Sequence, residues 1–398
     1  MTEPTPVTIH ELEGEALLEA VLPLRAYSLT VTPPLPDADG WRNFHRGLVE
    51  VRQFVLYEGE QPMATAAFNV MTQQVRGLVA PMGGVWGVAT HPAGRRKGYA
   101  RQLMQTLLAA MHDDGLPFTT LYAFRESFYE RLGYVIYQQP RSVTFDPAAL
   151  LPLLDRDIPG RVTLMPYIDG YEIVRGFLRQ QQLRQHGMAL FDEQTAHNFR
   201  GSAPRWVAVA HAADDETPLA VMVYRNGGSD DDMTMKINPF FYANSQGKYL
   251  LLAWIAQHAD QIDTAELRLA PAEQPGTWLA DLDVESKSAE PGLGRVLDVR
   301  KIGGLVVGPG TFSARISDPL APWNEGTYRF AGVEGRLHVE PADQADCQLT
   351  IHGLTALIYG THPPDDFVFR GWGDPAPVTQ AIMQTMFPLA QPFLYEQF

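Results

Sequence analysis

Residues 84–100 read Gly84-Val85-Trp86-Gly87-Val88-Ala89-Thr90-His91-Pro92-Ala93-Gly94-Arg95-Arg96-Lys97-Gly98-Tyr99-Ala100. The apolar run Gly84–Thr90 predicts a short strand, and the glycine- and arginine-rich segment after it predicts a turn. A helix is predicted over Tyr99–His112, because its apolar residues share one broad face: Leu103, Leu107 and Ala110, flanked by Met104, Leu108 and Met111. This order of strand, basic turn and amphipathic helix is typical of an α/β domain.

The start of this helix is a predicted anion site. The first N–H groups of a helix have no partner within it and lie at the positive end of the helix dipole, so a diphosphate can accept their hydrogen bonds. Gly98 lets the main chain approach phosphates closely, and Ala100 is small enough not to block that approach. Arg95 and Arg96 add positive charge. An ordinary solvated turn that caps a helix is the alternative interpretation of this loop taken alone.

The segments around the loop complete a mixed α/β pattern up to about Gln139. Val51–Tyr57 and Met63–Val70 are expected to pair as antiparallel strands across the turn Glu58-Gly59-Glu60. After the long helix the sequence predicts three more elements, which are a strand over Phe118–Tyr122, a short helix through Phe128, Tyr129 and Leu132 that ends at Gly133, and a last strand over Tyr134–Tyr137.

Two further units are predicted in the rest of the chain. Residues 140–159, which contain several prolines, are expected to form a boundary segment. A second α/β unit then echoes the first, with strands over Trp206–Ala210 and Leu219–Tyr224, a helix over Tyr249–Ala259 and a strand over Ala265–Leu269. A third unit is expected to begin near Gly294, with strands over Arg295–Val299, Phe312–Ile316, Thr327–Phe330, Leu337–Val339 and Cys347–Ile351, and helices over Leu354–Tyr359 and Val378–Met386.

The composition limits the possible partners. A chain of 398 residues with 45% hydrophobic residues is expected to fold into two or three domains. The formal charge of −15 argues against nucleic acid and weakly favours cationic substrates, although it also serves solubility. A single cysteine, Cys347, excludes a disulfide within the chain and a cysteine-based metal cluster. No apolar run approaches the roughly 20 residues that cross a bilayer, so we expect a cytoplasmic protein with no membrane partner.

The loop and a second motif together resemble the GNAT acetyltransferase superfamily. In that superfamily a strand leads into Arg/Gln-x-x-Gly-x-Gly/Ala and then a helix, as in residues 84–100. The second motif, Phe128-Tyr129-Glu130-Arg131-Leu132-Gly133-Tyr134, resembles its aromatic-Tyr-x-x-x-Gly-aromatic element. Longer segments extend the likeness to the Eis-like (enhanced intracellular survival) acetyltransferases over essentially the whole chain: Phe124–Tyr129 leading into Gly133, Gly294–Val299, Asp318–Asn324 and the ending in Phe398.

This resemblance implies an α/β (α+β) fold in three domains. Residues 1–145 would be the catalytic GNAT domain, residues 146–290 a degenerate GNAT-like domain, and residues 291–398 a sterol-carrier-protein-like domain that supplies the C-terminal carboxylate. The turn Asn244–Tyr249 of the second domain lacks the paired arginines, so it is not expected to hold CoA. The family also implies a homo-oligomer, typically a hexamer.

The resemblance further implies that acetyl-CoA is the cosubstrate, that no metal is needed and that an amine is the acceptor. The implied cofactor-binding residues are Val88, Ala89, Thr90, Arg95, Arg96, Lys97, Gly98, Tyr99, Ala100 and Arg101. Tyr129 is the expected general acid, because a phenol with a pKa of about 10 can return a proton to the released thiolate. Many GNAT enzymes place an acidic base on the strand before the loop, and Gly84–Thr90 contains none. In the Eis-like family the C-terminal carboxylate is the base, and here it belongs to Phe398.

The acceptor and two competing functions are left open by the sequence. A polyamine, an aminoglycoside or a lysine side chain of a protein would each suit the resemblance. Tyr27, Trp41, Phe44 and Trp86 are candidates for lining the amine pocket, although core packing is the commoner role of such residues. The alternatives to an enzyme are a carrier of hydrophobic ligands built on the third domain and a regulatory scaffold that binds CoA without catalysis.

Overall fold

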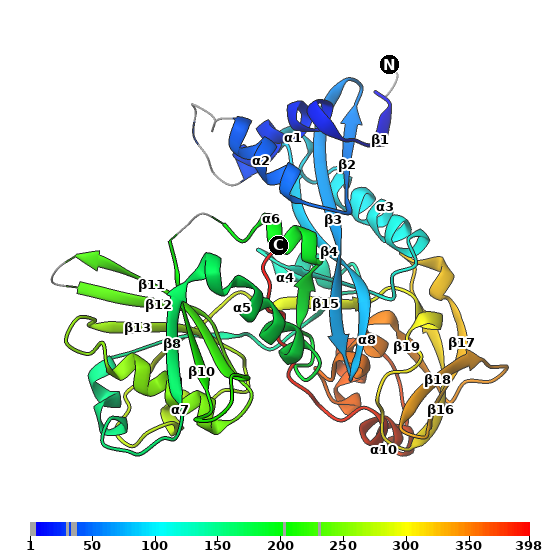
Figure 1. Cartoon of the computed structure of the whole chain (residues 1–398). Coiled ribbons are helices and arrows are strands. Elements are labelled where there is room, and N and C mark those ends of the chain that lie inside the picture. The colour runs from blue at the N-terminus through cyan, green and yellow to red at the C-terminus, as the bar shows by residue number, and fades with distance from the viewer. Residues whose placement is uncertain (1–4, 29–31, 33–37, 202–203, 230–231) are drawn as a thin grey trace. The chain divides into compact units, whose positions relative to one another are not determined.

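The computed structural model describes residues 5–28, 32, 38–201, 204–229 and 232–398 (Figure 1). They form two compact units. The first unit contains residues 1–137, 186–199 and 292–398, and the second contains residues 138–185 and 200–291. Among the described residues, every helix is too short or too polar to span a bilayer.

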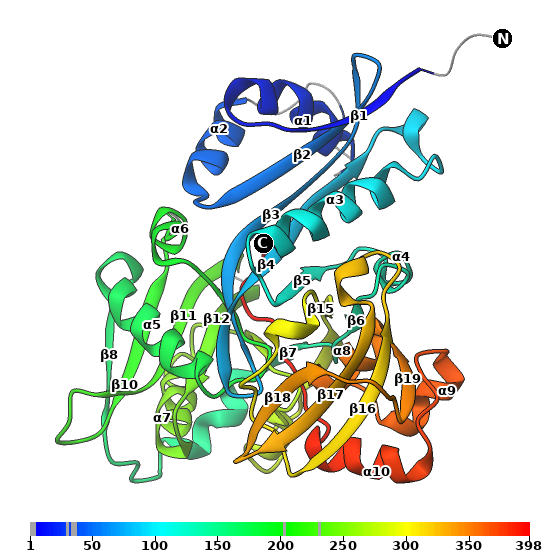
Figure 2. The ribbon, with the colours of Figure 1, turned by 90° about the vertical axis from the view of Figure 1, so that its right-hand side faces the viewer.

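An eight-stranded sheet is the framework of the first unit (Figures 1 and 2). Its order is β1-β2-β3-β4-β5-β15-β6, and β9 pairs with β3 outside this path. The strands are β1 (Val7–Glu11), β2 (Val51–Glu58), β3 (Gln61–Val75), β4 (Leu78–Thr90), β5 (Phe118–Tyr122), β6 (Val135–Ile136), β9 (Ala189–Phe191) and β15 (Gly292–Val296). The predicted antiparallel pairing of β2 with β3 is confirmed. β4 begins at Leu78, six residues before the predicted start at Gly84.

Helices cover both faces of this sheet. They are α1 (Gly14–Ser28), α2 (Ala38–Gly47), α3 (Tyr99–Asp113), α4 (Glu126–Glu130) and α6 (Glu193–Asn198). Successive strand residues point to opposite faces, so Phe54 and Leu56 of β2 pack with α3 while Val55 packs with α1. The apolar stripe predicted for α3 is buried throughout, from Leu103 to Met111.

The strand expected to open the third unit lies elsewhere than predicted. It spans Gly292–Val296 rather than Arg295–Val299, and it pairs antiparallel with both β5 and β6 in the sheet of the N-terminal region. Glycine is needed at this position, because a Cβ on Gly294 would lie 2.0 Å from the phenol oxygen of Tyr137. Leu293 and Val296 are buried, so the strand also contributes to the core of the unit.

A four-stranded sheet follows in the C-terminal part of the first unit. Its order is β18-β17-β16-β19, with β16 (Gly310–Ser317), β17 (Gly326–Val333), β18 (Arg336–Pro341) and β19 (Cys347–Thr350) close to the predicted ranges. The helices are α8 (Ile351–Tyr359), α9 (Phe367–Arg370) and α10 (Pro377–Met386). One hydrophobic core joins this region to the larger sheet, since Phe312 and Leu354 pack in the same cluster as Met82 and Phe118.

The second unit is built on a seven-stranded sheet in the order β14-β7-β13-β12-β11-β10-β8. The strands are β7 (Arg141–Phe145), β8 (Arg161–Pro166), β10 (Trp206–His211), β11 (Pro218–Ser229), β12 (Asp232–Tyr242), β13 (Thr264–Leu269) and β14 (Glu285–Ser288), and the helices are α5 (Tyr167–Gln182) and α7 (Ser245–Ala256). The predicted boundary segment over residues 140–159 contains regular structure. β7 lies there with buried Val143 and Phe145, because Pro140 precedes the strand and the other prolines follow it.

The second unit repeats the strand and helix order of the first. The N-terminus of its helix α7, however, is capped by a side chain. β11 and β12 pair antiparallel with an irregular register near Met222, and β12 then runs parallel to β13. The side chain of Asn244 accepts a hydrogen bond from the N–H of Gly247 at 2.9 Å and so caps α7. A Cβ on Gly247 would lie 2.5 Å from the carbonyl oxygen of Leu219. This helix start is therefore already capped and packed.

Candidate functional site

A bulge in β4 separates that strand from β5. Ala67 of β3 pairs with Trp86 and Thr65 pairs with Ala89, so Gly87 and Val88 together oppose one residue of β3. Gly87 has a φ of 63°, the left-handed region that glycine tolerates. The parallel register with β5 runs from Met82–Phe118 to Val85–Leu121, whereas β4 continues to Thr90. Within the described strands, residues 86–90 have no partner on the β5 side.

The turn after β4 presents main-chain amides. Pro92–Gly94 form a 3-10 turn that His91 caps, with its Nδ1 accepting from the N–H of Ala93 at 3.2 Å. Arg96 and Gly98 both have a left-handed backbone, with φ of 66° and 84°. α3 begins at Tyr99, and no side chain caps it. The first amides of α3 are therefore left for a ligand.

A cavity of about 750 Å³ lies along this turn. Its size is in the range of small-molecule sites. Every predicted cofactor residue except Lys97 lines it: Val88, Ala89, Thr90, Arg95, Arg96, Gly98, Tyr99, Ala100 and Arg101. The structure thus brings these residues together around one space, and their binding of a cofactor remains a prediction.

Lys97 is directed elsewhere. Its ammonium forms an ion pair with Glu58 at 2.8 Å, and this pairing raises the pKa of Lys97 above its ordinary value. Its main-chain N–H donates to the carbonyl oxygen of Gly94 at 3.3 Å. Both donors of Lys97 are engaged within the protein, so the structure gives this residue no place in the cavity.

The cavity is strongly basic. Arginines from both motifs line it: Arg95, Arg96, Arg101, Arg125 and Arg131. No acidic residue is among its lining residues in the described part of the chain. Arg125 and Arg131 were not predicted, although both lie in the segments on which the resemblance rests. Such a lining suits a ligand with several phosphate groups.

Phe128 and Tyr129 have different surroundings. Phe128 lines the cavity, whereas Tyr129 is 3% exposed and packs in the core beside α3. The two rings meet edge to face with centroids 4.9 Å apart. Burial raises the pKa of Tyr129, and the neighbouring Tyr134 adds to this effect. A phenol with the ordinary pKa of about 10 is already protonated at neutral pH, and burial does not change this.

The C-terminal segment is fixed against the larger sheet. Tyr122 donates to the carbonyl oxygen of Leu394 at 2.5 Å, and the N–H of Phe191 donates to the carboxylate of Glu396. The Phe398 ring lies 5.7 Å from the ring of Tyr122, and a Cβ on Gly84 would lie 3.0 Å from it. The C-terminus lies near β4 in both views (Figures 1 and 2). The last residue is therefore held beside the strand that carries the bulge.

A buried ion pair connects the second motif to the C-terminal region. The guanidinium of Arg295 is fully buried and donates to both carboxylate oxygens of Asp318, at 2.7 and 2.8 Å. Its Nε donates to the carbonyl oxygen of Leu132 at 2.9 Å. Asn324 donates to Asp318 at 2.9 Å. These bonds connect the turn after Tyr129 to the segments Gly294–Val299 and Asp318–Asn324, on which the resemblance to the Eis-like family rests.

The predicted aromatic candidates divide into two groups. Trp41, Phe44 and Trp86 gather together, with Phe44 and Trp86 centroids 5.5 Å apart and Trp41 and Phe44 centroids 6.4 Å apart. Tyr27 instead faces the guanidinium of Arg95 at 5.7 Å.

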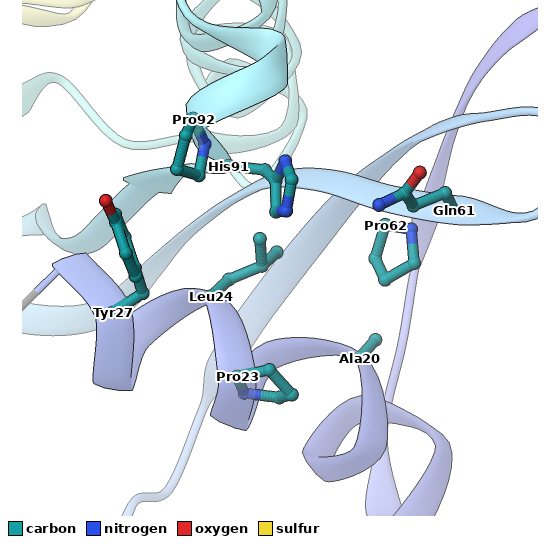
Figure 3. Close-up of a pocket in the computed structure, with 8 residues that line it drawn as sticks. All are labelled: Ala20, Pro23, Leu24, Tyr27, Gln61, Pro62, His91 and Pro92. Atoms are coloured by element: carbon teal, nitrogen blue, oxygen red, sulfur yellow. The ribbon is translucent and has the colours of Figure 1, made fainter. Parts of the chain in front are cut away.

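Tyr27 also borders a smaller pocket of about 340 Å³. Figure 3 shows this pocket between α1, which carries Ala20, Pro23, Leu24 and Tyr27, and the segments of Gln61, Pro62, His91 and Pro92.

Comparison with known families defines the class of this protein. Residues 9–137 match the acetyltransferase (GNAT) domain, and residues 295–395 match the sterol carrier protein domain. The chain is therefore a GNAT-type, acyl-CoA-dependent N-acetyltransferase with a C-terminal sterol carrier protein domain. Proteins of this class use acetyl-CoA as a cosubstrate.

Solved structures share this architecture over the whole chain. A GCN5-related N-acetyltransferase from Anabaena variabilis has a TM-score of 0.85 at 16% identity, and a probable N-acyltransferase from Enterococcus faecalis has 0.84 at 18%. Eis1 from Mycobacterium abscessus has 0.79 at 18%. Each alignment covers 99% of this chain and 100% of the other. At these sequence identities the comparison establishes that the chain shares the fold of all three proteins, including Eis1. No curated protein matched the chain.

The cavity predicts different roles for neighbouring basic residues of the loop. Changing Arg95 and Arg96 together to Gln should raise the Kd for acetyl-CoA by about 10- to 100-fold, because charged hydrogen bonds to phosphate are lost. Lys97→Gln, the matched control, should change the Kd for acetyl-CoA by less than about threefold, since this substitution removes only an exposed ion pair with Glu58. Isothermal titration calorimetry measures both. Equal weakening by the two variants would contradict this assignment.

Proposed function

We propose that the chain transfers the acetyl group of acetyl-CoA to a primary amine by direct attack of that amine on the thioester. The observation that carries the proposal is the arginine-lined cavity at an uncapped helix start, beside the open edge of β4. A helix start favours anions, and the arginines add charge for the phosphates. The unpaired strand edge offers main-chain groups to the amide-rich arm of the cofactor.

The proposed pose follows from the order of these elements. The diphosphate accepts hydrogen bonds from the amides of Gly98 to Arg101, with Arg95 and Arg96 beside it. The arm of the cofactor runs along residues 88–90, and the N–H of Val88 stabilises the oxyanion that forms at the thioester carbonyl. The bulge supports this role, because it places Val88 outside the regular ladder.

Tyr129 is the proposed general acid. A phenol that stays protonated at neutral pH holds a proton for the departing thiolate. Support comes from the position of Tyr129 in α4, whose Phe128 lines the cavity.

The α-carboxylate of Phe398 is the proposed base. It takes the proton of the attacking amine, which reacts only in its neutral form. Support comes from the hydrogen bonds that hold the tail and from the packing of the Phe398 ring against Gly84. In this account the C-terminal region delivers the carboxylate, and the second unit holds no CoA because Asn244 caps its helix.

Release of CoA thiol tests the reaction itself. The unchanged chain should release CoA thiol only when an amine is supplied, and a panel of diamines, aminoglycosides and amino acids identifies acceptors.

Tyr129→Phe tests the proposed general acid. This variant should lower kcat about 100-fold with acetyl-CoA affinity unchanged, because the thiolate loses its proton donor. Tyr134→Phe is the matched control: it removes a phenol from the same motif that bonds Thr119 at 3.1 Å, and kcat should change by only a few fold. Binding of acetyl-CoA without thiol release for any amine would instead support a regulatory scaffold.

Extending the chain beyond Phe398 tests the base. A Gly-Ser tail of a few residues converts the α-carboxylate of Phe398 into an amide, so kcat should fall about 100-fold. The same residues added before Met1 should leave kcat unchanged. Initial rates at saturating amine compare the two proteins. Full activity of the C-terminally extended chain would exclude the terminal carboxylate.

A further inference from the structure

Arg25 of α1 lies in an aromatic cluster on the N-terminal part of the first unit. Its guanidinium carbon is 4.3 Å from the ring centroid of Trp41, 4.8 Å from that of Trp86 and 5.8 Å from that of Phe44. The ring of His45 is stacked on Trp41 with centroids 6.5 Å apart. Cation–π contacts of this kind hold the guanidinium in place while leaving its donors for other partners.

The cluster contains buried polar atoms that have no hydrogen-bond partner among the described residues. Within the described residues, Arg25 Nη1, His45 Nε2 and Trp86 Nε1 are buried and have no hydrogen-bond partner. Arg25 forms no ion pair there either. Since buried polar atoms are normally satisfied, three such atoms in one cluster are available to a bound ligand.

The charge of the cluster is positive. Burial lowers the pKa of Arg25 to about 10, so it remains a cation at neutral pH. Burial, together with the charge of Arg25, lowers the pKa of His45 to about 4, so it is neutral. Arg25 is therefore an uncompensated cation among aromatic walls.

This cation lies beside the proposed reaction centre. A Cβ on Gly87 would be 3.7 Å from the guanidinium carbon of Arg25, and Gly87 directly precedes Val88. Trp86 of the same strand belongs to the cluster. Two residues further back, Gly84 contacts the ring of Phe398.

A row of aromatic rings continues from this cluster to the C-terminus. Phe44 lies 5.5 Å from Trp86 and 5.4 Å from Phe199, Phe199 lies 6.1 Å from Phe191, and Phe191 lies 6.4 Å from Phe398. The ring of Phe398 and the carboxylate of Glu396, which accepts from the N–H of Phe191, are at one end of this row, and the guanidinium of Arg25 is at the other. A flat apolar body with a positive and a negative end matches this distribution.

We infer that Arg25 binds a carboxylate of the acceptor, so that this enzyme prefers amines that also carry a carboxylate next to an aromatic or apolar body. The inference rests on the proposed function, because it places the acceptor amine toward the base at Phe398. A guanidinium matches a carboxylate with two parallel hydrogen bonds, whereas it repels a polycation such as a polyamine. The net negative charge of the whole chain does not oppose this local preference, because its field is screened beyond about 8 Å at physiological salt.

4-(Aminomethyl)benzoate and benzylamine provide the test, since they differ only by a carboxylate at the end of the ring opposite the amine. The unchanged enzyme should show a kcat/KM for 4-(aminomethyl)benzoate at least about tenfold above that for benzylamine, as expected for a charged hydrogen bond. Arg25→Gln should lower kcat/KM for 4-(aminomethyl)benzoate about tenfold, mainly through KM, and change that for benzylamine by less than about threefold. Arg25→Lys should retain part of the preference because it keeps the charge. Unchanged acetyl-CoA affinity in calorimetry shows that each variant is folded.

The outcomes separate this inference from the proposed function. If benzylamine is the better acceptor, or if Arg25→Gln slows both amines equally, the inference fails while the acetyltransfer reaction stands. If acetyl-CoA binds and no amine releases its thiol, the proposed reaction fails, and the inference fails with it.

Discussion

Between Trp86 and Ala89, β4 places Gly87 and Val88 opposite a single residue of β3, and this bulge is the constraint on which the site depends. A side chain at Gly87 would be strained by its left-handed backbone, and it would approach Arg25. Because the strand bends there, β4 leaves β5 after Val85 and exposes main-chain groups toward the cavity. Arg25 of the aromatic cluster lies beside Gly87, and the next residue, Val88, lines the cavity.

The C-terminal region also helps to hold the site in place. β15 completes the sheet beside β5, and Arg295 on that strand binds Asp318 and the carbonyl group of Leu132. A buried ion pair of this type adds little net stability, because desolvation offsets its attraction. Its consequence is geometric: the turn after Tyr129, the C-terminal sheet and the edge of the larger sheet are held in one arrangement. The tail that ends in Phe398 then returns to β4.

The sequence predicted the parts of the site that depend on neighbours along the chain. The strand, turn and helix of residues 84–112 follow from local periodicity, and the loop residues are adjacent, so their shared cavity was foreseeable. The arrangements that the sequence did not predict depend on distant partners. Lys97 turns to Glu58, and β15 joins a sheet formed some 170 residues earlier. The cluster around Arg25 is assembled from α1, α2 and β4. The sequence named its rings as candidates, but no spacing signals Arg25 among them. Which of Phe128 and Tyr129 lines the cavity depends on the direction of a short helix, which a motif does not specify.

The central claim is that the amides after Gly98 hold the diphosphate of acetyl-CoA and thereby bring its thioester to the bulge at Val88. A crystal structure of the complex with acetyl-CoA tests it most directly. The account predicts the diphosphate within hydrogen-bond distance of the N–H groups of Gly98 to Arg101, and the thioester carbonyl at the N–H of Val88. Acetyl-CoA bound in another part of the protein, or a cavity that stays empty at saturating cofactor, would contradict it.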